Sequence, residues 1–169
     1  MAGEISSCDI KIYYAPESTA GTCPSTGWAQ KAASGTLNIN DYVTGISGLS
    51  ADLEKYDVTP LSTPVGGRRS FVPGLYGNDG AVTLNVNVNN LSRTDWGKIV
   101  SEAEALTSGK SLWFEFVLPG EDKGWFIRAT PLPMQFPDVE VGQAVQGTVT
   151  LIENKCTGWA ALRTETISG

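Results

Sequence analysis

The sequence predicts a mainly β protein, an antiparallel β-sandwich or partly open barrel with one flanking α-helix. Three observations support this class. Five or six short segments read as strands, several of them alternating apolar and polar side chains with the period of two of a half-buried strand. Turn-forming Gly, Pro, Asn and Asp separate them, and only one segment, late in the order, has helical periodicity. A run of strands with a single helix favours antiparallel sheets over a parallel α/β fold.

The chain of 169 residues is expected to form a single domain, because no repeat or low-complexity tract divides residues 1–169. Its content of 41% hydrophobic and 18% charged residues is typical of a folded globular chain and not of a disordered one. The longest apolar runs, such as 112–118, are too short to span a bilayer, and residues 1–10 lack the features of a signal peptide. We therefore expect no contact with a membrane and folding in a cytoplasm.

The first strand is expected at 8–15, in the stretch CDIKIYYA, where Ile10, Ile12 and Tyr14 share one face. Residues 1–35 then read as a strand and an arm, because a connection rich in Ser, Thr, Gly and Pro follows, with Trp28 as its only large apolar anchor. A second strand is expected within 36–49, with Leu37 and Ile39 facing the same way.

A long polar loop is expected over residues 57–79. The stretch 56–75 reads YDVTPLSTPVGGRRSFVPGL and holds three prolines, three glycines and two adjacent arginines. A loop of that length inside a compact domain is unusual, and it is normally functional or disordered.

The alternation at 81–89, AVTLNVNVN, has no fault and predicts a strand. Its apolar face is expected to be buried, and its other face carries only small uncharged side chains: Thr83, Asn85 and Asn87.

A helix is expected at 92–108. Ser92 and Asp95 have the spacing of a capping box, and Gly109 suits the position after the helix end. The apolar face is expected to consist of Trp96, Ile99, Val100, Ala103 and Leu106, whereas the face of Lys98, Glu102 and Thr107 is expected to be solvated.

The stretch 111–132 predicts a β-hairpin with a turn at PGEDKG, and Leu112, Phe114, Phe116 and Leu118 are expected to form its core face. Trp113 and Trp125 are on less certain faces and are candidates for a subunit contact.

A last strand is expected at 144–156. Here Val145, Val149 and Leu151 alternate with Gln146, Thr148 and Thr150. Residues 155–169 are expected to be a C-terminal extension, in which Trp159 docks the tail or contacts a neighbour.

The chain contains no histidine, which excludes histidine triads, histidine metal ligands and the usual proton shuttle near neutral pH. Cys8, Cys23 and Cys156 are odd in number and far apart, so reduced thiols are expected rather than disulfides or a zinc site. The glycine-rich stretches GGRR and GLYGNDG do not have the spacing of a phosphate-binding loop.

The remaining catalytic candidates are carboxylates, which cluster at 52–57, 121–122 and 138–140. The last two clusters fall in expected turns, where acidic side chains are mostly solvated, and a glycosidase needs two carboxyls across a cleft. The net charge of −6 and a pI near 4.6 argue against a surface that grips nucleic acid phosphates. We therefore expect no enzyme, no catalytic residue, no metal and no cofactor.

The stretch 56–89 resembles the signature of the major tail tube proteins of long-tailed bacteriophages of the siphophage type. In that family an Asp-x-Thr element, a polar loop, a Phe-x-Pro-Gly-Leu element and an alternating strand follow one another. The elements in this sequence are 57–59, 71–75 and 81–89. The similarity extends through the helix, the Pro-Gly hairpin and the stretch PDVEVGQAVQGTVTL, and it covers about residues 36–153.

The resemblance implies a phage tail-tube-like fold and a structural virion protein of the phage tail, assembled in the host cytoplasm. Chains of this family form sixfold rings, and the rings stack into a hollow tube through which DNA is ejected without specific binding. A tape measure protein, a tail tip and a terminator are the implied partners besides other copies of the chain.

Within such a tube, the 57–79 loop is expected to reach the next ring and to become ordered there, with Arg68 and Arg69 pairing with Asp138 and Glu140 of a neighbour. The candidate contact residues between subunits or rings are Asp57, Thr59, Arg68, Arg69, Phe71, Tyr76, Asp138, Glu140 and Trp159. The candidate residues lining the channel are Thr83, Asn85, Asn87, Thr148 and Thr150, because an uncharged wall does not hold DNA phosphates.

Two alternatives remain open at this point. The first is an inner-tube protein of a contractile phage tail or of an injection or secretion apparatus. The second, from a different class, is a monomeric carbohydrate-binding β-sandwich that uses Trp28, Trp113 or Trp159.

Overall fold

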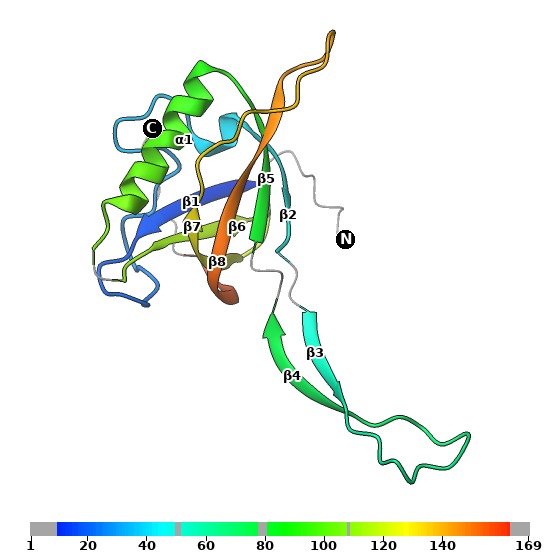
Figure 1. Ribbon diagram of the computed structural model, residues 1–169. Helices are drawn as coiled ribbons and strands as arrows, with labels where there is room; N and C mark the ends of the chain where they lie inside the picture. The colour runs from blue at the N-terminus through cyan, green and yellow to red at the C-terminus, as the bar shows by residue number, and fades with distance from the viewer. Residues whose placement is uncertain (1–9, 50–51, 78–80, 108, 163–169) are drawn as a thin grey trace.

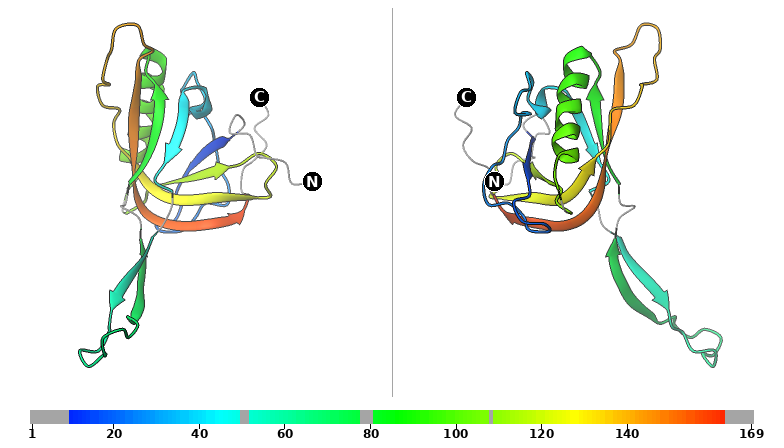
Figure 2. Two further views of the ribbon diagram at one scale, coloured as in Figure 1. Left: turned by 90° about the vertical axis from the view of Figure 1, so that its right-hand side faces the viewer. Right: turned by 60° about the vertical axis from the view of Figure 1, so that its left-hand side comes forward.

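The computed structural model describes residues 10–49, 52–77, 81–107 and 109–162, and its body is one curved antiparallel sheet (Figure 1). The sheet curves strongly but does not close into a barrel within the described residues, which confirms the predicted mainly β class (Figure 2). In spatial order, its strands are β1 (Lys11–Pro16), β6 (Leu112–Val117), β7 (Lys123–Pro131), β8 (Gln146–Ala161), β5 (Ala81–Asn87) and β2 (Val43–Ser47).

The main core lies between one face of this sheet and the single described α-helix, α1 (Asn90–Glu104). Trp96 of α1 is fully buried there, and its indole nitrogen donates to the carbonyl of Leu132 at 2.8 Å. The predicted core face of the hairpin is confirmed for Leu112, Phe114 and Phe116, which are buried in this cluster, whereas Leu118 is half-buried and lies outside it.

A second, smaller core covers the opposite face of β1, β6 and β7. The segment after β1 folds back over the sheet and places Trp28 against Phe126, with their rings 5.5 Å apart and nearly perpendicular. Trp113 is buried in the same cluster, so it is not at the surface where a subunit contact was expected. The expected arm within 1–35 is therefore packed against the body over its described part, residues 17–35, and residues 1–9 lie outside the described residues.

The strand expected within 36–49 is shorter than predicted. Residues Ile39–Asp41 form a 3₁₀ turn, η2, and the strand β2 begins only at Val43. The 3₁₀ turn forms here instead of a strand because a hydrogen bond stabilises its start. The Asp41 carboxylate accepts from the N–H of Asn38, the N-cap, at 2.9 Å. Leu37 and Ile39 still pack in the main core, although not as strand residues.

The helix begins earlier than predicted. Its N-cap is Asn89, whose side chain accepts from the Ser92 N–H at 2.8 Å, and the Ser92 hydroxyl accepts from the Asn89 N–H at 2.9 Å. The capping pair is therefore Asn89 and Ser92, and the expected pair of Ser92 and Asp95 is wrong. Asp95 is buried and accepts backbone hydrogen bonds instead.

Two residues of the α1 face that was expected to be solvated, Lys98 and Glu102, form hydrogen bonds to the rest of the chain. The Glu102 carboxylate accepts from the Tyr14 hydroxyl at 2.7 Å and from the Ala33 N–H at 3.0 Å. The Lys98 amine donates to the carbonyl of Ser34 at 2.7 Å. These contacts fasten the 31–38 segment to the helix.

The long polar loop expected over 57–79 is largely a β-hairpin. Strand β3 (Asp52–Asp57) pairs with β4 (Phe71–Gly77) in a separate two-stranded sheet, so only residues 58–70 form a loop. The hairpin projects from one end of the body (Figures 1 and 2). The Pro and Gly of the FVPGL element do not prevent a strand here because both strands of this sheet are edges.

The last strand is longer than predicted. β8 runs to Ala161, so residues 155–161 belong to the sheet and not to an extension. Residues 163–169 lie outside the described residues. Val149 and Leu151 are buried as expected, but Val145 lies before the strand and is exposed.

Candidate assembly surfaces

The loop at the tip of the hairpin, residues 58–70, is closed at its base by a polar clamp. The Asp57 carboxylate accepts from the hydroxyl and the N–H of Thr59, at 2.6 and 2.9 Å. The Thr59 hydroxyl in turn accepts from the Ser70 N–H at 2.9 Å, and the Val58 N–H donates to the carbonyl of Ser70. These hydrogen bonds, more than the Arg69 guanidinium 4.0 Å away, hold the pKa of Asp57 below its ordinary value.

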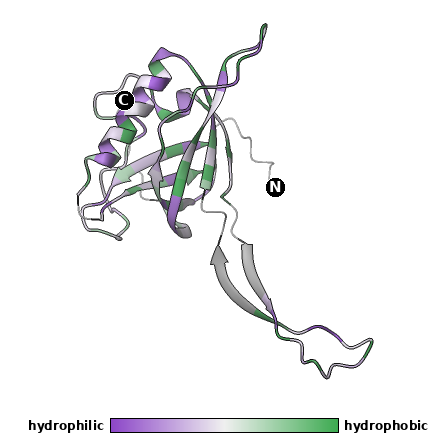
Figure 3. Cartoon of the chain, in the orientation of Figure 1, coloured by the Kyte–Doolittle hydropathy of each residue, from purple (hydrophilic) through white to green (hydrophobic). Residues whose placement is uncertain are grey.

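This hairpin loop presents apolar and basic side chains to solvent. Leu61 and Val65 are fully exposed, and Val65 sits in a turn closed by the Gly67 N–H and the Pro64 carbonyl at 2.9 Å. Gly66 takes a positive φ of 86°, which the third position of such a turn requires. Arg68 and Arg69 are its only charged residues. Colouring by hydropathy shows both kinds of residue on the loop (Figure 3).

A second projection, the 132–145 loop between β7 and β8, extends from the opposite end of the body (Figures 1 and 2). Its tip is a turn in which the Gln143 N–H donates to the carbonyl of Glu140 and Gly142 has a φ of 84°. Phe136, Val139 and Val141 are exposed, and Asp138 and Glu140 are its only charged residues.

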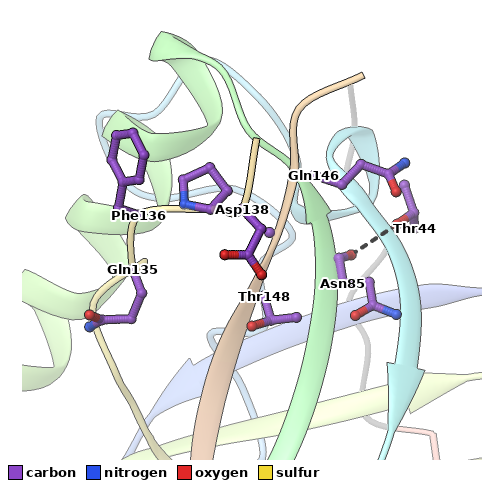
Figure 4. A pocket seen from close by; sticks show the side chains of 9 residues that line it. Thr44, Asn85, Gln135, Phe136, Asp138, Gln146 and Thr148 are labelled. Carbon is purple, nitrogen blue, oxygen red and sulfur yellow. Dashed lines mark hydrogen bonds between the residues drawn. The ribbon is translucent and has the colours of Figure 1, made fainter. Parts of the chain in front are cut away.

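A polar recess of about 330 Å³ lies at the root of this loop, against β2, β5 and β8. Figure 4 shows the Asp138 side chain pointing from the loop toward Thr148, while Phe136 points away from the sheet. The Thr44 hydroxyl donates to the carbonyl of Asn85 at 3.2 Å across the recess floor.

The outer face of β5 and β8 forms a wall of uncharged side chains, and its end at Asn85 and Thr148 lies beside Asp138 at the root of the 132–145 loop. The register pairs Thr83 with Thr150 and Asn85 with Thr148, and Asn87 lies opposite Gln146, whose amide donates to it at 3.2 Å. The five channel candidates therefore lie side by side on one face, at least partly exposed. Whether this face lines a channel remains a prediction.

An apolar cavity of about 410 Å³ lies at the root of the hairpin. Leu49 is one of its lining residues, and β3 begins three positions later. Trp125 and Trp159 line it as a perpendicular pair with ring centroids 5.4 Å apart, and Trp159 is 52% exposed. Trp159 was identified from the sequence, but the cavity was not. The lining comes from β2, β6, β7, β8 and their flanks, and from the residue before β1. The lining residues are Ile10, Ile46, Leu49, Phe116, Leu118, Trp125 and Trp159.

The predicted contact residues fall into separate groups. Asp57, Thr59 and Arg69 meet at the base of the hairpin loop, with Arg68 beside them, and Phe71 is exposed on β4. The carboxylates of Asp138 and Glu140 are at the other end of the same chain, so pairing with the arginines requires a second copy (Figure 1). Tyr76 lies in β4, but its side chain is outside the described part.

No described group of three or more Cys, Asp or Glu side chains has the geometry of a metal site. Glu121, Asp122, Asp138 and Glu140 are exposed, as expected for turn charges. No helix in the described ranges is long and apolar enough to cross a membrane. Of the three tryptophans of the carbohydrate-binding alternative, Trp28 and Trp113 are buried, which leaves only Trp159.

No family model and no curated protein matches the chain. Its fold is shared with chains in three cryo-EM structures, each 14% identical in sequence. The first is the anti-feeding prophage baseplate, 6-fold symmetrised, with a TM-score of 0.58 over 97% of this chain and 100% of that one. The second is the anti-feeding prophage tube terminating cap, with a TM-score of 0.54 over 96% of this chain and 94% of that one. The third is the PVC sheath/tube terminator of an extracellular contractile injection system in its extended state, with a TM-score of 0.52 over 89% of this chain and 94% of that one. All three are contractile injection systems and not siphophage tails, and at this identity the likeness shows the fold alone.

Proposed function

We propose that this protein is a structural subunit of a phage tail or tail-like particle, which assembles into rings that stack into a tube. The observation that carries the proposal is the placement of two unlike projections at opposite ends of one body, on a fold shared with chains of injection-system particles. Unlike surfaces at opposite ends give head-to-tail association, which extends into a filament.

The charges of the two projections support this direction of stacking. The hairpin loop carries two arginines and no acid, and the 132–145 loop carries Asp138 and Glu140 and no base. In the proposed contact, Arg68 and Arg69 of one copy lie on Asp138 at the root of the next copy's loop, and Glu140 lies nearer the tip of that loop. The clamp at Asp57 and Thr59 presents the hairpin loop in a fixed shape before assembly, which lowers the entropy lost on binding.

Within such a tube, the uncharged wall of β5 and β8 would face the channel, and DNA would pass along it without being held. A hexameric ring is the stoichiometry that we propose. The role is structural, without catalysis. A siphophage-type tube is the first reading of the sequence signature at 57–89.

The second candidate is a tube, baseplate or terminating subunit of a contractile injection apparatus, which the titles of the three structural neighbours favour. A terminating subunit stops growth of the tube at one ring. A chain that has a projection for assembly at each end is suited to continue the growth of the tube.

Electron microscopy of the purified full-length chain over a concentration series tests the proposal. Long tubes are expected for a tube subunit, and single rings for a terminating subunit. A protein that stays monomeric at all concentrations and salt conditions would contradict both readings. Glycan binding lost on Trp159→Ala would then favour the carbohydrate-binding alternative.

A further inference from the structure

We propose that the apolar cavity at the root of the β3–β4 hairpin receives the Val141 tip of the 132–145 loop from a second copy of the chain. This inference rests on the proposed function and adds a second contact to it. The first contact joins the hairpin tip to the root of the loop, and the second joins the tip of the loop to the root of the hairpin.

The cavity is built for an apolar group. All seven of its lining side chains are aliphatic or aromatic, and its volume of about 410 Å³ lies within the range of about 300–1,000 Å³ typical of binding pockets. Trp159 keeps half of its surface exposed although it packs edge-to-face on Trp125. Tryptophan in this half-covered state is a frequent anchor of protein contacts.

The tip of the 132–145 loop offers a matching group. Val141 is fully exposed and Val139 is largely exposed, whereas Met134 of the same loop packs against the main core. The turn between Glu140 and Gln143 holds Val141 at the outermost position. The tip cannot fill the cavity of its own chain, because the loop and the hairpin project from opposite ends (Figure 1).

The lengths of the two projections allow both contacts to form together. The hairpin strands, of six and seven residues, span about 20 Å, and the shorter limb of the 132–145 loop, from Val141 to the start of β8 at Gln146, can reach about 17 Å. When the hairpin of one copy lies antiparallel to the loop of the next, the tip of each projection therefore reaches the root of the other.

The decisive variant is Val141→Asp, with Gln143→Asp as a matched control that adds the same charge two positions away, at an exposed site. Burial of a valine contributes about 1.5–3 kcal/mol, so the critical concentration for assembly of Val141→Asp is expected to rise at least about tenfold. Gln143→Asp is expected to assemble like the wild type. Circular dichroism of both variants verifies that the monomer is folded.

The occupant is identified by a photo-crosslinking residue at position 141 in mixed 15N-labelled and unlabelled chains. We expect crosslinks between labelled and unlabelled copies, to peptides that contain Leu118, Trp125 or Trp159. Crosslinks to another surface, or normal assembly of Val141→Asp, would overturn this inference and leave the proposed function in place. Failure of the wild type to assemble would contradict both the inference and the proposed function. A small apolar molecule retained in the cavity of the assembled wild type would contradict the inference alone.

Discussion

Glu17 and Arg128 form a buried ion pair in which the guanidinium Nε lies 2.5 Å from the carboxylate Oε1. The same carboxylate also accepts from the Trp113 indole at 2.7 Å and from the N–H groups of Gly21 and Ser111, at 3.1 and 3.0 Å. One acid thus fastens the segment after β1 to β6 and β7.

Removing this acid is expected to destabilise the monomer strongly. Glu17→Ala leaves a largely buried guanidinium and an indole N–H without their acceptor, which costs about 3–5 kcal/mol. Urea unfolding followed by tryptophan fluorescence measures the loss. Glu121→Ala, in an exposed turn, is the control and should stay within about 0.5 kcal/mol of the wild type.

The same carboxylate predicts an acid-sensitive fold. Burial alone would raise the pKa of Glu17, but hydrogen bonds from Arg128, Gly21, Trp113 and Ser111 outweigh it and lower the pKa from 4.5 to about 2. The stabilisation is therefore complete above about pH 4.5 and is lost as the pH falls toward 2. The free energy of unfolding should fall in that window, and Glu17→Gln should flatten its pH dependence. An equally steep fall in Glu17→Gln would assign the sensitivity to other acids.

Asp95 is expected to hold the 31–38 segment on the helix. Its carboxylate accepts from the N–H groups of Thr36 and Leu37, at 2.9 and 2.5 Å. Asp95→Ala leaves both donors without an acceptor and should cost about 2–4 kcal/mol of unfolding free energy. Asp95→Asn keeps one acceptor oxygen and should lose less; equal losses for both variants would show that the charge, and not the acceptor, is what matters.

Charge reversal on the hairpin loop should block stacking and leave the monomer intact. Arg68→Glu/Arg69→Glu places two new carboxylates against Asp138 at the proposed contact, and these groups repel one another. Sedimentation should show no tubes, while thermal unfolding is unchanged because both side chains are exposed. Adding Asp138→Lys/Glu140→Lys should restore assembly. Lys31→Glu/Lys110→Glu is the matched control, and normal tubes from the first double variant would disprove the pairing.

Basic residues on the uncharged wall should make a tube hold DNA. Thr83→Lys/Thr150→Lys places two cations opposite each other in the register of β5 and β8, outside the recess at which the arginines are proposed to bind. Assembled tubes of this variant are expected to retain short duplex DNA in a manner that weakens steeply with salt, unlike wild-type tubes. Ser18→Lys/Ala20→Lys, on the exposed segment after β1, is the control. Equal retention by both variants would mean that the wall does not line the channel.

The parts of the fold that could be predicted from the sequence are the strands in which apolar and polar residues alternate. Val82, Leu84 and Val86 alternate with polar residues and therefore share one face of a strand, whatever surrounds it. The pattern alone therefore predicted strand β5, and it predicted the 111–132 hairpin in the same way. The wall followed too, because opposite residues of paired strands share a face.

The remaining elements depend on partners distant in sequence. The segment before the 3₁₀ turn at 39–41 is held by Asp95 of the helix, which accepts two of its N–H groups, and Trp113 is buried because a chain segment nearly 90 residues earlier covers it. Strand β4 pairs only with β3, in a sheet separate from the main one, and its sequence does not alternate like that of β5. The cavity is assembled from four strands, β2, β6, β7 and β8, with their flanks, and from the residue before β1, and no local signal marks it.

Strand β8 pairs with β5 through residues 146–152 and with β7 through residues 151–161, across two register shifts. The strands on its two sides, β5 with β2 and β7 with β6 and β1, are consequently joined through one backbone, so loss of β8 would open both ladders. Amide hydrogens in the middle of this strand should exchange last and at a single rate, so pulling on the subunit would meet its greatest mechanical resistance there.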